Sequence, residues 1–253
     1  MCTVSWLRIP GGYELFCNRD ERHARKLAAP PAVRETRGVR FVAPADGDAG
    51  GTWIGVNEAG LTLCLLNRYE DAPSLRSDAA PRDDYRSRGL LLAGLMDCAS
   101  VSQVRARVAG ADLSRHRPFT LAAISADEPA LLVRWKNNER SFDADGDASM
   151  PLTSSTYRTG GVIAARKLLF RRMVEESGAV SPAMLRDFHG SHHPERGPFS
   201  VCMHREDAAT VSFSRVRVGG GTVEFSYQPG PPCAGSPAAR VCLPLKREVA
   251  QAR

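Results

Sequence analysis

Strand-like and helix-like segments follow one another in blocks along this chain of 253 residues, and their order is the strongest constraint on its fold. Apolar runs separated by turn residues predict strands up to residue 67, then two helices, two strands, two more helices and a final group of strands. Such runs of both types are typical of the α+β class, in which helices cover antiparallel sheets. Because no internal repeat and no low-complexity linker interrupts the chain, residues 1–253 are predicted to form a single domain.

The individual elements follow from periodicity and from capping and turn residues. Ser87, Ser100 and Ser181 are expected to cap helices. Residues 23–37, which contain two adjacent prolines, and the charged segment 70–86 are expected to form loops. Helices are predicted at 88–96, 101–108, 162–176 and 182–188, and strands at 3–9, 13–17, 39–42, 51–56, 61–67, 119–125, 130–135, 199–203, 209–218, 222–227 and 241–243.

The charge of the chain argues against one class of partner. The formal net charge is +6, which favours anionic partners in general. The arginines are nevertheless scattered and interleaved with acids, as in residues 82–86, and no aromatic-basic array of the kind that binds nucleic acid occurs. A nucleic-acid partner is therefore not predicted.

The sequence contains no recognisable membrane-spanning or secretory signal. No apolar run approaches the roughly 20 residues that span a bilayer, and the first residues lack the basic and apolar regions of a secretory signal. The seven cysteines form no CxxC pair and lie mostly in apolar runs, where a reduced cysteine acts as a small hydrophobe. This pattern favours a reducing compartment, so a cytoplasmic location without membrane insertion is expected.

Cys2 is the most informative candidate for chemistry. If Met1 is removed, Cys2 carries a thiol and a free α-amine on one residue, which is a nucleophile with its own base. An α-amine titrates at about 7.7–8.0 and a free thiol at about 8.5, so both are near neutrality. The alternative is that a cysteine occurs at position two by chance and has no function, and Cys2 by itself does not exclude this.

A predicted hairpin brings further candidates to Cys2. The strand at 3–9 is followed by a Pro-Gly-Gly turn, and the second strand returns beside the start of the chain. Arg19 and Asp20 are then expected near Cys2, where a guanidinium favours the thiolate and a carboxylate can orient the amine. A solvated turn is the alternative explanation for this charged cluster.

A second strand–turn–strand block covers residues 51–67, with a tight turn at 57–60. Its second strand is apolar on both faces, which indicates a sheet covered on two sides. The strand ends at Asn67, whose side-chain amide can stabilise an oxyanion or simply cap a turn.

Two other clusters offer alternative sites. His189, His192 and His193 are expected to be exposed loop residues, because no nearby cysteine completes a recognised ligand spacing, so no metal is predicted. Cys202 and His204 fall on one face of the predicted strand at 199–203 and its end, so a catalytic dyad is conceivable there. Cys2 is preferred because Cys202 lies in an apolar run.

Taken together, these residues resemble the NRDE family, of the transport-and-Golgi-organisation type. The family is named after the tetrapeptide at residues 18–21, and the resemblance covers nearly the whole chain. It implies a four-layer αββα fold of the N-terminal-nucleophile hydrolase kind, with more distant similarity to choloylglycine hydrolases and penicillin V acylases. Further motifs that carry it are Met1-Cys2-Thr3, the Gly-Thr-Trp-Ile-Gly block at 51–55, Asn67, and weaker markers at 201–205 and 210–212.

The resemblance also implies roles and a reaction. Cys2 is the expected nucleophile, Arg19 the cation that stabilises the thiolate, Asp20 the acid that orients the amine, and Asn67 an oxyanion donor. Those acylases space the arginine and the acid three apart, so Glu21 competes with Asp20, and their later catalytic asparagine has no clear match near residues 154–155.

The implied activity is hydrolysis of a linear amide or related acyl bond through an S-acyl intermediate, with no metal or cofactor. The alternative is a non-catalytic protein that binds and traffics haem, a lipid or an acyl ligand in the same cleft. The expected partner is accordingly a small acyl or amide substrate, or a hydrophobic ligand such as haem. The sequence does not determine the oligomeric state.

Overall fold

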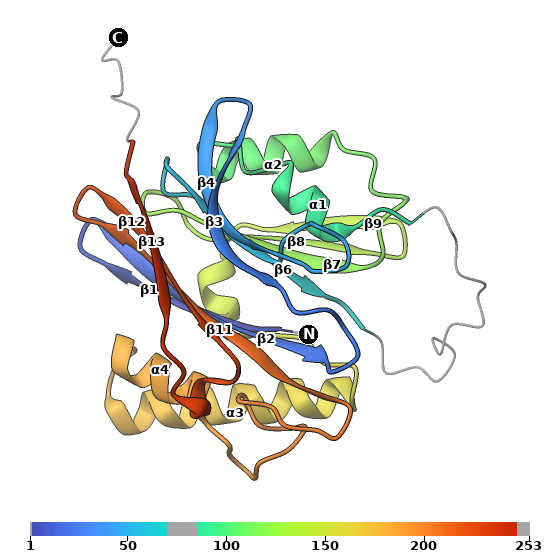
Figure 1. Ribbon diagram of the computed structural model, residues 1–253, viewed down its shortest axis with the longest axis vertical. Coiled ribbons are helices and arrows are strands. Elements are labelled where there is room, and N and C mark those ends of the chain that lie inside the picture. The colour runs from blue at the N-terminus through green and yellow to red at the C-terminus, as the bar shows by residue number, and fades with distance from the viewer. Residues whose placement is uncertain (1, 70–84, 247–253) are drawn as a thin grey trace.

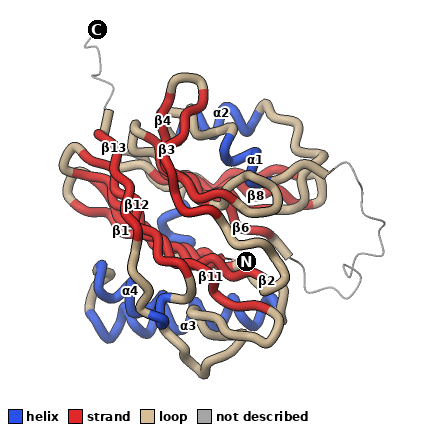
Figure 2. The backbone as a smooth tube through the Cα atoms, viewed as in Figure 1, coloured by secondary structure: helices blue, strands red, loops and turns tan. Residues whose placement is uncertain are grey.

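The computed structural model describes residues 2–69 and 85–246 and consists of two antiparallel sheets packed face to face between two layers of helices (Figure 1). The strands form the two inner layers and the helices lie on the outer faces (Figure 2). The predicted α+β class and four-layer αββα sandwich are therefore confirmed. In the part of the chain that the structure describes, no helix is long and apolar enough to cross a membrane.

The six-stranded sheet has the order β10-β1-β2-β11-β12-β13, and the seven-stranded sheet runs from β3 to β9 in sequence order. The first contains β10 (Leu152–Thr153), β1 (Cys2–Ile9), β2 (Gly12–Arg22), β11 (Ala208–Gly219), β12 (Thr222–Pro229) and β13 (Ala239–Pro244). The second contains β3 (Ala29–Thr36), β4 (Val39–Ala45), β5 (Ile54–Asn57), β6 (Thr62–Asn67), β7 (Phe119–Ile124), β8 (Leu131–Lys136) and β9 (Glu139–Asp143).

Two helix pairs cover the outer faces. Helices α1 (Arg88–Ala93) and α2 (Val101–Ala109) pack on the seven-stranded sheet, and α3 (Thr159–Ser177) and α4 (Pro182–Gly190) pack on the six-stranded sheet. Ser100 and Ser181 cap α2 and α4 by accepting hydrogen bonds from backbone N–H groups, as predicted, whereas the Ser87 side chain makes no capping bond.

The main core lies between the two sheets. Side chains that alternate along the strands, among them Trp6, Leu15 and Ile54, are completely buried there. Burial of each such side chain contributes about 1.5–3 kcal/mol. The strand ending at Asn67 is buried on both faces as predicted, because its alternate residues face either this core or helices α1 and α2.

The hairpin of β1 and β2 aligns Cys2 with Arg19 and closes at Gly12. A Cβ atom on Gly12 would lie 1.9 Å from the carbonyl oxygen of Val218, so only glycine allows β11 to approach this closely. Strand β2 continues to Arg22, beyond the predicted end at residue 17, because β11 pairs with it along its whole length. Arg19 therefore lies within a central strand.

Several segments differ from the predicted elements. Residues 29–36 form strand β3 instead of a loop, and the two prolines are tolerated because β3 is the edge of its sheet. Residues 139–143, for which no strand was predicted, form β9 at the other edge. Residues 199–203 form no strand, because the Met203 N–H is bound by the Thr210 hydroxyl instead of a ladder partner. Of the expected loop at 70–86, residues 70–84 lie outside the described residues.

His189 is not an exposed loop residue, in contrast to the prediction. It lies on α4 and is completely buried, with Nδ1 3.1 Å from Asn18 Oδ1 and Nε2 2.9 Å from the Ser5 hydroxyl. The Asn18 amide donates to two backbone carbonyls, so its oxygen accepts from Nδ1–H and Nε2 accepts from Ser5. Burial lowers the pKa of His189 to about 3, and the positive charge of Arg166 contributes to this decrease.

The free energy of unfolding is expected to decrease as the pH falls below about 6.5. In this range His189 becomes protonated in the unfolded chain, whereas in the folded chain it stays neutral down to about pH 3. The loss is about 1.4 kcal/mol per pH unit, or roughly 2 kcal/mol between pH 7 and pH 5. Urea titrations at both pH values measure it. His189→Gln should reduce this pH dependence by the same amount, and an unchanged dependence in that variant would contradict the assignment.

Candidate active site

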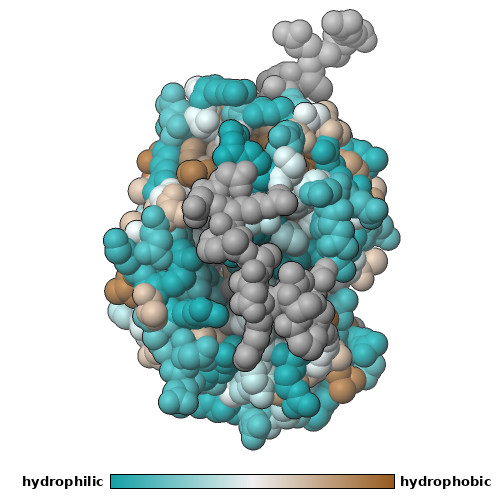
Figure 3. Space-filling model, turned by 90° about the vertical axis from the view of Figure 1, so that its right-hand side faces the viewer, coloured by the Kyte–Doolittle hydropathy of each residue, from teal (hydrophilic) through white to brown (hydrophobic). Residues whose placement is uncertain are grey.

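Cys2 lies at a cleft of about 460 Å³ between the ends of the two sheets. β1 and β2 supply Cys2, Arg19 and Glu21, and β6 supplies Asn67 from the opposite sheet. The face of the molecule at which β2 and β6 end is predominantly hydrophilic (Figure 3). Cys2, Arg19 and Asn67, which the sequence predicted to act together, therefore line one cleft.

The Cys2 thiol is buried but reaches the wall of this cleft, with 5% of the residue exposed. The pKa of Cys2 is lowered from its ordinary value by the neighbouring Cys17 thiol and by the positive charges of the amino terminus and Arg19, against the opposing effects of burial and Asp20. The neighbouring Cys2 sulfur and burial raise the pKa of Cys17 well above its ordinary value, and the Cys17 thiol donates to the Asn18 carbonyl at 3.7 Å. Cys2 is therefore the sulfur of this pair that ionises first.

Ser154 fixes the backbone of Cys2. The Cys2 nitrogen donates to Ser154 Oγ at 3.1 Å, and the Ser154 N–H donates to the Cys2 carbonyl at 3.0 Å. The Cys2 nitrogen is a peptide nitrogen as long as Met1 is attached, and it becomes the α-amine once Met1 is removed. Ser154 follows β10, which pairs with β1. An acceptor is thus already placed beside the atom that would serve as the catalytic base.

Arg19 faces Cys2 across the hairpin and is nearly buried. Its guanidinium stacks over the Trp53 ring at 4.1 Å and donates to Asp46 Oδ2 at 2.5 Å. Although burial opposes it, the pKa of Asp46 is held below its ordinary value by the Ala49 N–H and by the charges of Arg25 and Arg19. Arg19 therefore has a carboxylate partner of its own in the cleft, in addition to its place opposite Cys2.

The two candidate acids lie on opposite faces of β2. Asp20 faces α3, where Arg166 Nη1 lies 3.3 Å from Oδ2 and the Thr210 hydroxyl donates to Oδ1 at 2.7 Å. Glu21 lines the cleft and pairs with Arg19 at 3.5 Å. The contacts described for Asp20 join it to α3 and β11. The assignment of the orienting acid to Asp20 or Glu21 stays a prediction.

Asn67 is the last residue of β6 and is half-buried. Its Nδ2 donates to the hydroxyl of Tyr69 at 2.8 Å. The strand-end position predicted for Asn67 is confirmed, and its amide lies at the cleft as an oxyanion donor requires. Its role in catalysis stays a prediction.

The family model for Transport and Golgi organisation 2 matches residues 1–184. The chain belongs to this family. The predicted resemblance is therefore confirmed at the level of the family, and the match includes Cys2, the tetrapeptide at 18–21 and Asn67. No sequence among the curated proteins matches the chain.

Solved structures with the fold of this Transport and Golgi organisation 2 family member include N-terminal-nucleophile hydrolases, as the sequence resemblance implied. Penicillin V acylase from Agrobacterium tumefaciens is 12% identical with a TM-score of 0.54, over 95% of this chain and 86% of that one. The mutant C2A conjugated bile acid hydrolase from Clostridium perfringens is 12% identical with a TM-score of 0.55, over 95% and 92%. The N-acylethanolamine-hydrolyzing acid amidase orthologue of Caenorhabditis elegans is 10% identical with a TM-score of 0.61, over 85% and 92%. At these identities the similarity shows a shared fold.

Sequence reasoning assigned no role to several residues that lie in or beside the cleft of this family member. Cys17, Asp46 and Trp53 are separated from Cys2 by 15 to 51 positions in the sequence, and only the strand register and the loop after β4 bring them together. The hairpin register contained a usable signal for Cys17, because it lies two residues before Arg19 and so shares its face. Among the described lining residues, five arginines outnumber two acids: Arg19, Arg25, Arg86, Arg88 and Arg117 against Glu21 and Asp46.

Proposed function

We propose that this chain is an N-terminal-cysteine hydrolase that cleaves a linear amide bond. The observation that carries the proposal is the position of Cys2, whose sulfur reaches a cleft while its backbone nitrogen is held by Ser154. The shared fold of an acylase, a bile acid hydrolase and an acid amidase supports it. A cytoplasmic location belongs to the same proposal, because the nucleophilic thiol has to stay reduced.

The proposed reaction begins when removal of Met1 frees the α-amine of Cys2. The amine takes the thiol proton, and the Cys2 sulfur forms a bond to the acyl carbon of the substrate. The C–N bond then breaks as the α-ammonium gives its proton to the leaving amine. Water attacks the S-acyl intermediate, the amine takes a proton from that water, and the acid product leaves the regenerated thiol.

Two further groups support the transition state in this proposal. Asn67 Nδ2, which donates to Tyr69 in the unliganded cleft, would donate instead to the oxyanion on the acyl carbon. Ser154 would hold the α-amine so that its lone pair points to the sulfur. Both act on atoms of Cys2 or of the substrate, so neither needs a metal or cofactor.

The charge of the cleft indicates the class of substrate. Three more arginines than acids line its described walls, and guanidinium groups bind carboxylates through paired, charge-assisted hydrogen bonds. We therefore propose an amide substrate that carries a carboxylate. The charged walls do not favour transport of an uncharged lipid as the main function of the cleft.

Two anilides that differ in one group test this proposal. Glutaryl-p-nitroanilide, which has a free carboxylate, is expected to show a kcat/KM about 10- to 100-fold higher than pentanoyl-p-nitroanilide, since one charge-assisted hydrogen bond contributes about 1.5–3 kcal/mol. Release of p-nitroaniline is followed by absorbance. Arg117→Gln should reduce the ratio, whereas Arg172→Gln, on the outer face of α3, should leave it unchanged. Equal rates for the two anilides would contradict the anionic substrate class.

A further inference from the structure

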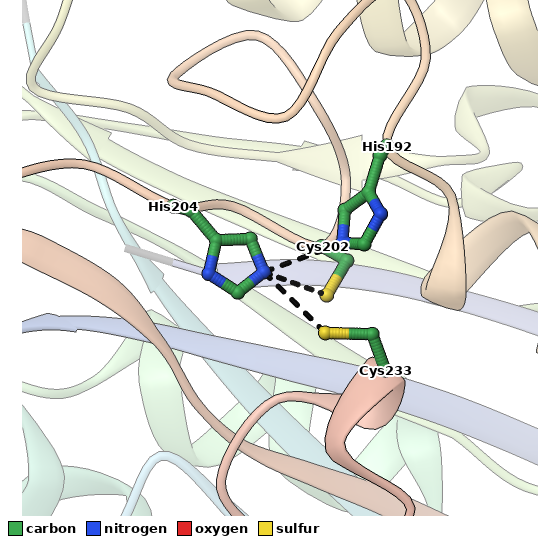
Figure 4. A group of neighbouring side chains, drawn as sticks. All are labelled: His192, Cys202, His204 and Cys233. Atoms are coloured by element: carbon green, nitrogen blue, oxygen red, sulfur yellow. Dashed lines mark hydrogen bonds between the residues drawn. The ribbon is translucent and has the colours of Figure 1, made fainter.

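A second cluster of reactive side chains lies outside the cleft. His192, Cys202, His204 and Cys233 direct their side chains toward one point (Figure 4). One ligand atom from each lies within 4.8 Å of all the others. None of the four lines the cleft at Cys2. The sequence did not predict this group, because Cys233 is 29 residues beyond His204.

Three separate segments bring the four residues together. His192 follows α4, Cys202 and His204 precede β11, and Cys233 lies in the short helix η3 (Pro232–Ala234) between β12 and β13. Helix η3 packs against α4 and β11. Cys202 is completely buried, the two histidines are half-buried and Cys233 is exposed, so the cluster lies at the edge of the helix layer.

The distances match those of a tetrahedral zinc site. His204 Nε2 lies 3.3 Å from His192 Nε2, 3.6 Å from Cys202 Sγ and 3.5 Å from Cys233 Sγ. With Zn–S of about 2.3 Å and Zn–N of about 2.0–2.1 Å, tetrahedral geometry places two nitrogens about 3.3 Å apart and a nitrogen and a sulfur about 3.6 Å apart. All three measured separations agree with these values.

Hydrogen bonds alone do not account for this arrangement. His204 Nε2 faces three neighbours at hydrogen-bonding distance, but an imidazole nitrogen has either one N–H or one lone pair in the ring plane. It can therefore satisfy one neighbour at most. A cation at the centre of the four donors satisfies all of them at once.

We propose that His192, Cys202, His204 and Cys233 form a structural zinc site. Two thiolates and two neutral imidazoles balance the charge of Zn²⁺, and four protein ligands leave no open position for catalysis. The site would hold residues 191–204, which form no helix or named strand in the described chain, to η3 and the back of the six-stranded sheet.

One contact has to change when zinc binds. Arg196 Nη2 lies 3.4 Å from His204 Nδ1, which carries the ring proton once Nε2 coordinates a metal. A guanidinium has no acceptor, so the two groups would then repel. Arg196 is exposed, and its side chain can rotate into solvent without disturbing the cluster.

Metal analysis of the untagged chain, purified under reducing conditions with zinc supplied, tests the proposal. We expect about one zinc per chain by mass spectrometry. After exchange with Co²⁺, the spectrum should show the intense d–d bands of a tetrahedral site and a thiolate-to-cobalt charge-transfer band. The cobalt spectrum is measured on the wild-type chain, so it remains decisive even where a ligand variant fails to fold.

Matched cysteine variants locate the site. Cys202→Ser and Cys233→Ser should each lose at least about nine-tenths of the bound metal and the charge-transfer band, because three ligands do not hold a closed site. Cys242→Ser, which changes an exposed cysteine outside the cluster, and Cys2→Ala should both retain one metal. Retention in Cys2→Ala also separates this proposal from the proposed hydrolase.

Three results would overturn the proposal. The first is a reduced wild-type chain that stays metal-free in excess zinc. The second is an octahedral cobalt spectrum without thiolate charge transfer. The third is a Cys202–Cys233 disulfide in protein that was alkylated at lysis, because it would show that the two sulfurs bond to each other instead of to a metal.

Discussion

Cys2→Ala is expected to lower kcat/KM for glutaryl-p-nitroanilide by at least about 10³-fold, because the variant has no atom that can form the S-acyl intermediate. The thermal midpoint should change little, since Cys2 lies at the wall of the cleft. Intact mass of the wild-type chain should show that Met1 is absent. A rapid acid quench during turnover should show the mass of one acyl group on the peptide that begins with Cys2.

Three controls sharpen this experiment. Cys242→Ser, which removes an exposed thiol on β13, should keep full activity. A chain with an uncleavable residue before Cys2 should fold but lose turnover, because its α-amine is blocked. Iodoacetamide at neutral pH should label Cys2 before Cys17 and Cys64, since the pKa of Cys2 is lowered whereas those of the other two are raised. Wild-type turnover in Cys2→Ala would refute the mechanism.

Asp20→Asn is expected to lower the free energy of unfolding by about 3–5 kcal/mol, because it leaves the charge of Arg166 buried without its carboxylate. Both side chains are almost completely inaccessible to solvent. Arg166 also donates to the hydroxyls of Thr3 and Thr153, so it joins β1 and β10 directly behind Cys2. Urea titration without substrate measures the effect separately from any role of Asp20 in catalysis.

The same helix supplies a matched control. Glu176→Gln makes the same change from acid to amide in the exposed pair of Arg172 and Glu176, and its stability should equal that of the wild type within error. Adding Arg166→Met to Asp20→Asn removes the unpaired charge, and it should restore part of the lost stability. If Asp20→Asn is as stable as Glu176→Gln, the buried ion pair does not stabilise the fold.

Short-range patterns in the sequence determined much of this fold. Pro-Gly-Gly at 10–12 and the turn at 57–60 fixed two hairpins, because each turn sets the register of the strands on both sides. Those registers put Arg19 opposite Cys2 and Asn67 at a strand end. The order of strands and helices determined the layers, since each element has to bury its apolar face.

The tertiary structure alone decided which distant residues meet. Ser154 reaches Cys2 because β10 pairs with β1, and His189 is buried because α4 packs over Asn18 and Ser5. The histidine and cysteine cluster depends on η3, which returns to α4 from the far end of the chain. Turns act over a few residues and leave a signal in the sequence. Contacts between separate elements depend on how whole sheets and helices pack, and no local pattern of residues encodes that.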